Sequence, residues 1–103
     1  MAVGLCNINK PIAEIAQIVA CEYGFTVEDL QGRCKEECLI WPRHLAMYMC
    51  WEAGHSYNYA SKFWKRHHGA MAHAKENILK MCTQHKELQK ERIRIAKLCG
   101  IID

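Results

Sequence analysis

Several features that mark large protein classes are missing from this sequence. Its 103 residues contain no apolar run that approaches the roughly 20 residues of a membrane span, and the start MAVGLCNINK lacks the apolar region of a signal peptide. The phosphate-binding pattern G-x-x-x-x-G-K-S/T is absent, and no nucleophile, base and orienting group form a recognisable set. We therefore expect a cytoplasmic protein that is not an enzyme, contacts no membrane and needs no cofactor.

Cysteine is plentiful, but it has neither disulfide-scaffold nor zinc-finger spacing. The seven cysteines are an odd number, so we interpret them as reduced thiols, most of them packed as small hydrophobic residues. Cys34 and Cys38, with His44 nearby, have a spacing compatible with zinc, but no second cysteine pair accompanies them. We predict no metal site and keep zinc as the less favoured alternative.

Length and composition predict one domain over residues 1–103, with residues 1–9 as a loose leader. The charge is unevenly distributed within it. Residues 1–42 hold three bases and six acids, a net charge of −3, whereas residues 43–103 hold the other 11 bases and five acids, a net charge of +6. This asymmetry predicts a positive field on the second half of the chain. A merely solvated helical surface is the alternative.

Helix start and stop signals predict six helices and no sheet. Pro11 can begin the first helix and Gly24 ends it, and Thr26 with Asp29 forms a capping-box-like pair at the second. Two helices carry one apolar face each, formed by Ile12, Ile15, Ala16 and Val19, and by Met71, Ala74, Ile78 and Cys82. The predicted helices cover about 11–23, 27–31, 42–53, 57–64, 68–82 and 86–99, and residues 54–56 and 65–67 should lie outside them.

The central third of the chain has the layout of a helix-turn-helix. Pro42 starts a helix that Gly54 ends, and Ser56 caps the short helix that follows. After a basic turn, Gly69 and Ala70 open the next helix with almost no side chain. Such a bare helix N-terminus can approach a phosphate backbone closely, because unpaired N–H groups and the helix dipole point outward there.

This stretch resembles the C-terminal DNA-binding domain of the bacterial replication initiator DnaA, a Trp-repressor-like helix-turn-helix. The family signature runs R-x-x-A-M-Y-L, then S-x-x-x-I-G-x-x-F, then G-G-R-D-H-T-T-V-x-H-A. The residues in step with it are Arg43, Ala46, Met47, Tyr48, Met49, Gly54, Ser56, Phe63, Arg66, His68, His73 and Ala74. The resemblance extends from about Ile12 to Leu98 and implies an all-α bundle of about six helices that binds double-stranded DNA.

The sequence departs from that signature in the turn and in the connection before it. Trp64 and Lys65 stand where the family has two glycines, so we expect the turn to be built differently. Trp41 stands where the family has an arginine that enters the minor groove, and an indole cannot make that charged contact. We expect Trp41 to be a core or helix-entry residue, with a wedge between bases as the less favoured alternative. The bases that could replace the arginine in part are Arg33, Lys35 and Arg43.

The residues that would read bases have also changed. The family's Asp-His-Thr-Thr is His67-His68-Gly69-Ala70 here, which removes most of the direct readout that the resemblance implies. We therefore expect phosphate contacts from Arg43, Lys62, Lys65 and Arg66, with limited base reading by His67, His68 and His73. Together with Ser56, Gly69 and Ala70 these are the candidate DNA-binding residues. Lys80 should lie on the same side, near the start of the helix that begins at about residue 68.

Two further expectations concern partners. Arg43 opposes the helix dipole in the first turn of its predicted helix, so it needs a partner, and we consider phosphate or Glu37. The last helix could close the core, touch phosphates or pair with a second chain as a homodimer. We predict a bacterial or phage regulator of transcription or replication initiation with sequence-preferring DNA binding. The alternative is a protein-interaction module that kept the fold and lost DNA binding.

Overall fold

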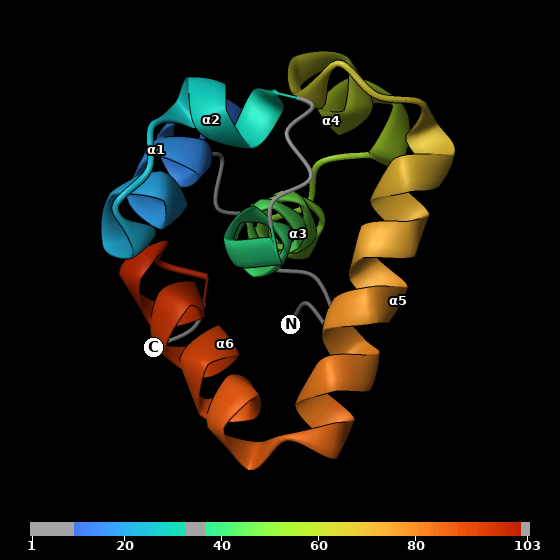
Figure 1. Ribbon diagram of the computed structural model, residues 1–103. Coiled ribbons are helices and arrows are strands. Elements are labelled where there is room, and N and C mark those ends of the chain that lie inside the picture. Colours follow the sequence, from blue (N-terminus) through green and yellow to red (C-terminus); the bar gives the residue numbers. More distant parts are fainter. Residues whose placement is uncertain (1–9, 33–36, 102–103) are drawn as a thin grey trace.

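The computed structural model describes residues 10–32 and 37–101, and these form six helices and no strand (Figure 1). This confirms the predicted all-α fold. The helices are α1 (Ile12–Tyr23), α2 (Val27–Gln31), α3 (Glu37–Glu52), α4 (Tyr57–Trp64), α5 (His68–Gln84) and α6 (Lys86–Leu98). In the described part of the chain, no helix is long and apolar enough to cross a membrane.

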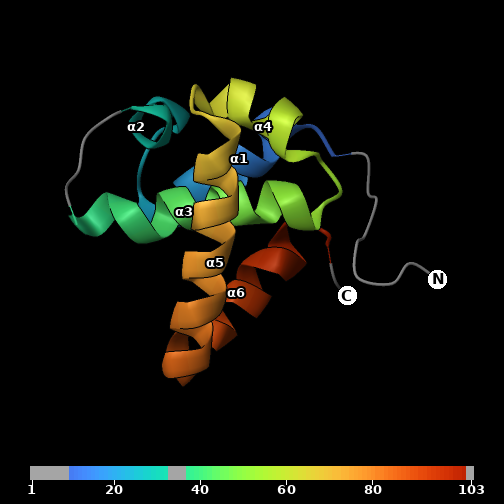
Figure 2. The same ribbon diagram turned by 90° about the vertical axis from the view of Figure 1, so that its right-hand side faces the viewer.

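Helix α3 is the centre of the molecule. Figure 1 shows it nearly end-on with the other helices around it, and Figure 2 shows it from the side with α5 crossing in front. Leu45 and Met49 are fully buried, and so are Ala46 and Cys50 beside them. A helix enclosed in this way is apolar on several sides rather than along one stripe.

The predicted start of α3 is wrong. The helix begins at Glu37, so Pro42 lies inside it, and residues 37–41 are helical rather than a connection. Proline lacks an N–H and removes a backbone hydrogen bond, but so near the helix start it interrupts only the second turn. Leu39 is buried in the core and Trp41 packs against it, which favours the helical path for this turn. Residues 33–36 lie outside the described part of the chain.

The predicted caps and apolar faces of the other helices are confirmed. Gly24 ends α1 with a φ of 78°. Thr26 Oγ1 accepts from the Asp29 N–H at 3.1 Å, and Asp29 Oδ2 accepts from the Thr26 N–H at 2.9 Å. The buried faces of α1 and α5 include all eight residues predicted for them. Residues 54–56 and 65–67 lie outside helices.

Helices α5 and α6 extend on two sides of α3 and meet at the lower end of the molecule in Figure 1. The predicted break between them falls at His85, which ends α5 and precedes α6. Beyond α6, Ile101 is buried. Cys50, Cys82 and Cys99 are also buried, whereas Cys21 and Cys38 are exposed.

Candidate nucleic-acid interface

The helix-turn-helix consists of α4, a three-residue turn and α5. Ser56 caps α4, because its Oγ accepts from the Tyr59 N–H at 3.1 Å. Ala60 and Trp64 are fully buried, whereas Phe63 is half-buried, so Trp64 is the aromatic anchor of α4. Trp64 therefore fixes the end of α4 on the core immediately before the turn.

The turn contains a left-handed residue, although it has none of the family's glycines. Lys65 has φ 57° and ψ 42°, and the Arg66 N–H donates to the Ser61 carbonyl oxygen at 3.0 Å. This is the usual way for a helix to end on a residue with positive φ. Lys65 thus adopts the positive φ that a glycine would permit, and the expectation of a turn built differently from the family's stays a prediction. A lysine can adopt this conformation at a cost of about 1–2 kcal/mol relative to glycine, and its side chain is exposed at the turn.

The start of α5 is capped by a histidine in place of the family's acid. His67 Nδ1 accepts a hydrogen bond from the Gly69 N–H at 3.1 Å, so this nitrogen carries no proton. A side chain on Gly69 would place its Cβ 3.3 Å from that same nitrogen. Glycine at this position thus leaves room for the capping ring. The His68 ring lies 4.2 Å from the His67 ring, centroid to centroid.

Two of the predicted phosphate contacts have another role in the structure. Arg43 is only 7% exposed, and its Nε and Nη2 donate to the carbonyl oxygens of Leu30 at 2.8 Å and Asp29 at 3.1 Å. Arg66 donates from Nη2 to the Gly32 carbonyl oxygen at 2.6 Å and from Nη1 to that of Gln31 at 3.2 Å. Both guanidinium groups satisfy carbonyls at the C-terminal end of α2. Arg43 thus bonds to backbone oxygens, which the sequence did not indicate, and its contact with phosphate stays a prediction.

The sequence reasoning missed Gln31 as part of this arrangement. Its Nε2 donates to the Phe63 carbonyl oxygen at 2.7 Å, which joins α2 directly to α4. A glutamine at the end of a short helix has no pattern that would identify it in advance. With the two arginines, it makes α2 a support for the turn.

The exposed residues around the turn are Lys62, Lys65, His67, His68, Gly69 and His73, with Ser56 farther along α4 and Ala70 half-buried. Within the described residues Lys62 makes no ion pair. Lys80 is the thirteenth residue of α5, about 18 Å along the axis from its start. The prediction that it lies near the helix N-terminus is therefore wrong.

A half-buried histidine, His44, holds α5 against α3 behind this surface. His44 Nδ1 lies 2.9 Å from Asn77 Nδ2, and its ring meets the exposed His73 edge-on at 5.7 Å. Burial lowers the pKa of His44 to about 4, with nearby His73, Arg43 and Arg66 acting in the same direction. His44 is thus neutral near pH 7 and serves the packing of α5.

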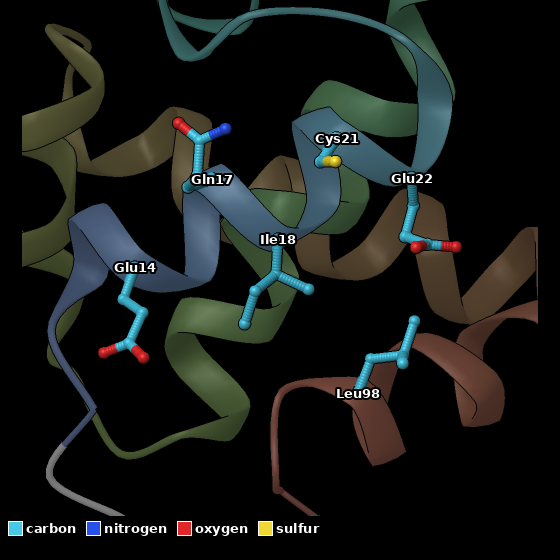
Figure 3. A pocket seen from close by; sticks show the side chains of 6 residues that line it. All are labelled: Glu14, Gln17, Ile18, Cys21, Glu22 and Leu98. Atoms are coloured by element: carbon cyan, nitrogen blue, oxygen red, sulfur yellow. The ribbon is translucent and has the colours of Figure 1, made fainter.

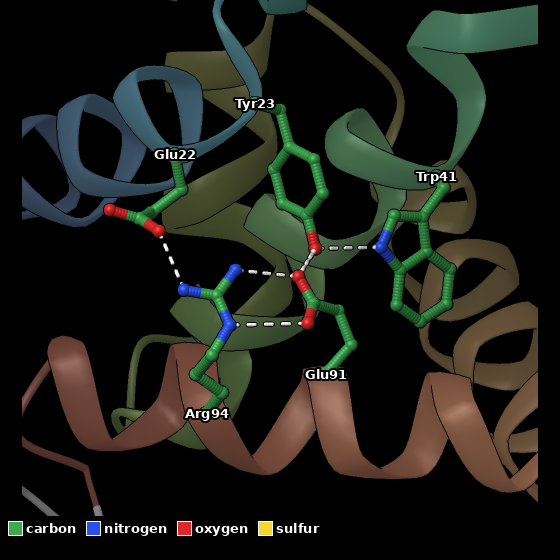
Figure 4. A network of polar contacts seen from close by, with 5 residues as sticks. All are labelled: Glu22, Tyr23, Trp41, Glu91 and Arg94. Carbon is green, nitrogen blue, oxygen red and sulfur yellow. Dashed lines mark hydrogen bonds and ion pairs between the residues drawn. The ribbon is translucent and has the colours of Figure 1, made fainter.

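Trp41 takes part in a polar network away from the turn, as Figure 4 shows. Its Nε1 donates to Tyr23 Oη at 2.9 Å, and Tyr23 Oη donates to Glu91 Oε1 at 2.8 Å. Arg94 joins Glu91 and Glu22, each at 2.6 Å. Trp41 is half-buried against the core, inside α3 rather than at its entry, and it ties α3 to α1 and α6. Arg33 and Lys35 lie outside the described part of the chain, as does Cys34 of the alternative zinc site.

Helix α6 carries five basic residues, of which two make contacts within the described part of the chain. Arg92 lies over the Tyr48 ring at 5.9 Å and Arg94 is in the network just described, whereas Lys86, Lys90 and Lys97 are exposed.

An apolar cavity of about 360 Å³ lies between α1 and the end of α6 (Figure 3). Leu98 lines this cavity and is 47% exposed. The homodimer through α6 stays a prediction.

Helix α4, the three-residue turn and helix α5, packed on the central helix α3, define this chain as a helix-turn-helix domain. The profile of the family described as bacterial dnaA protein helix-turn-helix matches residues 12–78. The chain belongs to that family, which confirms the resemblance.

The relatives with recorded names are similar to this chain over most of its length. It is 34% identical over 80 residues to the chromosomal replication initiator protein DnaA of Latilactobacillus sakei, covering 76% of this chain and 18% of the relative. It is 31% identical over 87 residues to the protein of the same name from Onion yellows phytoplasma, covering 84% of this chain and 17% of the relative. The chain thus spans less than a fifth of these relatives' length.

Proposed function

We propose that this domain binds double-stranded DNA with α5 in the major groove and α4 against the backbone. The observation that carries the proposal is the exposed pair Lys62 and Lys65 beside the exposed start of α5. Docking of this kind is typical of helix-turn-helix proteins. The names of the relatives point to replication initiation as the process, and a bacterial or phage regulator of replication or transcription acting in the cytoplasm fits the same surface.

Phosphate contacts carry most of the affinity in this proposal. Lys62 and Lys65 supply charge, and the positive end of the α5 helix dipole adds to it, while the Gly69 N–H already donates to His67 Nδ1. Arg43 and Arg66 support the turn from behind through α2. Two lysine–phosphate contacts give a slope of log K against log salt of about −2. This slope is shallower than the one expected if Arg43 and Arg66 also contacted phosphates.

The test is fluorescence anisotropy on several duplexes across a salt series. The variant K62A/K65A should weaken binding to all sequences about equally and flatten the slope by about two units. The matched control is K86A/K90A, which removes two exposed lysines from α6. Helix α6 begins at the end of the molecule opposite to α4 (Figure 1). An equal loss in both variants would mean that general charge, and not this surface, binds the duplex.

The second candidate is a protein-interaction module. The observation in its favour is the apolar cavity between α1 and α6, where Leu98 is exposed, together with the lost acid and threonines at residues 67–70. Absence of duplex binding by the wild-type chain at low salt would favour this candidate and remove the first.

A further inference from the structure

The outer face of α5 carries one acid among neutral and basic residues. Opposite the buried stripe lie Gly69, His73, Glu76 and Lys80, and all four are exposed. Glu76 is the one Asp or Glu residue in α5. It follows His73 by three residues, or about 4.5 Å along the helix axis, so the two side chains lie on the same face in adjacent turns.

The carboxylate of Glu76 is not engaged by the neighbours that could neutralise it. Over residues 10–32 and 37–101 it makes no hydrogen bond or ion pair. Lys75 instead places its Nζ over the Trp51 ring at 4.6 Å from the centroid. Lys80, four residues on, forms no ion pair with it either.

An unpaired carboxylate on a helix in the major groove is repelled by phosphates on both sides. It lowers affinity for every duplex unless a base offers it a hydrogen-bond donor. The exocyclic amino group of cytosine is such a donor, and Glu is a residue that accepts from it in the major groove. An acid there weakens binding to most DNA sequences, and only sequences that place a donor opposite it offset the repulsion. This difference in affinity between sequences is specificity.

We propose that Glu76 is a specificity-determining residue whose carboxylate accepts from the amino group of a cytosine in the major groove. The role rests on the proposed function, because it requires α5 to enter that groove. Glu76 lies about 12 Å along the helix from His68, so the cytosine is a different base from the one at the start of α5. The lost acid at His67 is thus compensated about two and a half turns later.

The test selects bound duplexes from a randomised pool with the wild-type chain and with Glu76→Gln, which keeps the shape and removes the charge. The wild type should prefer a C·G pair at one position, and E76Q should lose that preference. In the selected duplex, a cytosine analogue without the exocyclic amino group should weaken wild-type binding about tenfold and leave E76Q binding unchanged. Binding of E76Q to unselected duplex should be stronger than that of the wild type.

The control is Glu87→Gln, which removes an exposed acid from the first turn of α6. It should leave the selected sequence unchanged. If E76Q selects the same sequence as the wild type, or if the analogue weakens both proteins equally, the role of Glu76 is overturned while duplex binding stands. If the wild-type chain binds no duplex, the proposed function falls and the role of Glu76 falls with it.

Discussion

Arg43 Nε donates a hydrogen bond of 2.8 Å to the carbonyl oxygen of Leu30, so an arginine of α3 closes the C-terminal end of α2. Because the guanidinium is buried, its loss leaves backbone carbonyls without a donor. We expect Arg43→Met to lower the free energy of unfolding by about 2–3 kcal/mol, measured by urea denaturation. Where both proteins are folded, the salt slope of DNA binding should not change. A slope flattened by one unit would instead return Arg43 to the phosphate contacts.

Two variants of Lys65 distinguish the effect of backbone strain on stability from the effect of charge on DNA binding. Lys65→Gly should relieve the positive φ of 57° and raise the free energy of unfolding by about 0.5–1 kcal/mol. Lys65→Ala keeps the strain and should not stabilise. Both variants remove the same ammonium group, so both should flatten the salt slope of binding by about one unit. Equal stability of the two variants would contradict the left-handed turn.

His67 should stabilise α5 through its cap. Replacing it by Ala removes the acceptor for the Gly69 N–H and should lower the free energy of unfolding by about 1 kcal/mol. His67→Asp restores a short acceptor at the positive end of the helix dipole and should recover that loss. Thermal unfolding at pH 7 compares the three proteins. If His67→Asp is no more stable than His67→Ala, the hydrogen bond does not act as a helix cap.

His44 makes stability depend on pH. Its pKa falls from 6.5 to about 4 in the folded state, chiefly through burial, so the unfolded chain binds more protons between these values. Stability is therefore full above about pH 6.5 and is lost as the pH falls toward 4. We expect a loss of about 1–2 kcal/mol by pH 5 after allowance for solvent screening. His44→Gln does not titrate, and the same acid loss in that variant would contradict this role.

The fold was largely predictable because its signals are local. Gly24, the Thr26 and Asp29 capping box and Ser56 mark helix ends in the sequence as they do in the structure. The predicted start of α3 at Pro42 was wrong, because a proline in the second turn removes only one hydrogen bond. Packing around the buried Leu39 offsets that loss.

The candidate site was predictable in place but not in the role of each residue. Lys62 and Lys65 are exposed at the turn as expected. Arg43 and Arg66 bond to carbonyl oxygens at the end of another helix, α2. No periodicity or motif in the sequence indicates that the end of α2 lies beside these two arginines. Glu76 escaped notice because a single acid on a helix is normally only solvated.

The central claim is that duplex DNA contacts the start of α5 and the end of α4. Amide chemical-shift mapping on the labelled chain, with a duplex titrated at low salt, tests it most directly. We predict the largest shifts at Lys62, Lys65, Gly69 and Ala70, with those of Ile18 and Leu98 at the opposite cavity unchanged. Shifts confined to Ile18, Leu98 and their neighbours, or no shifts at all, would contradict the claim.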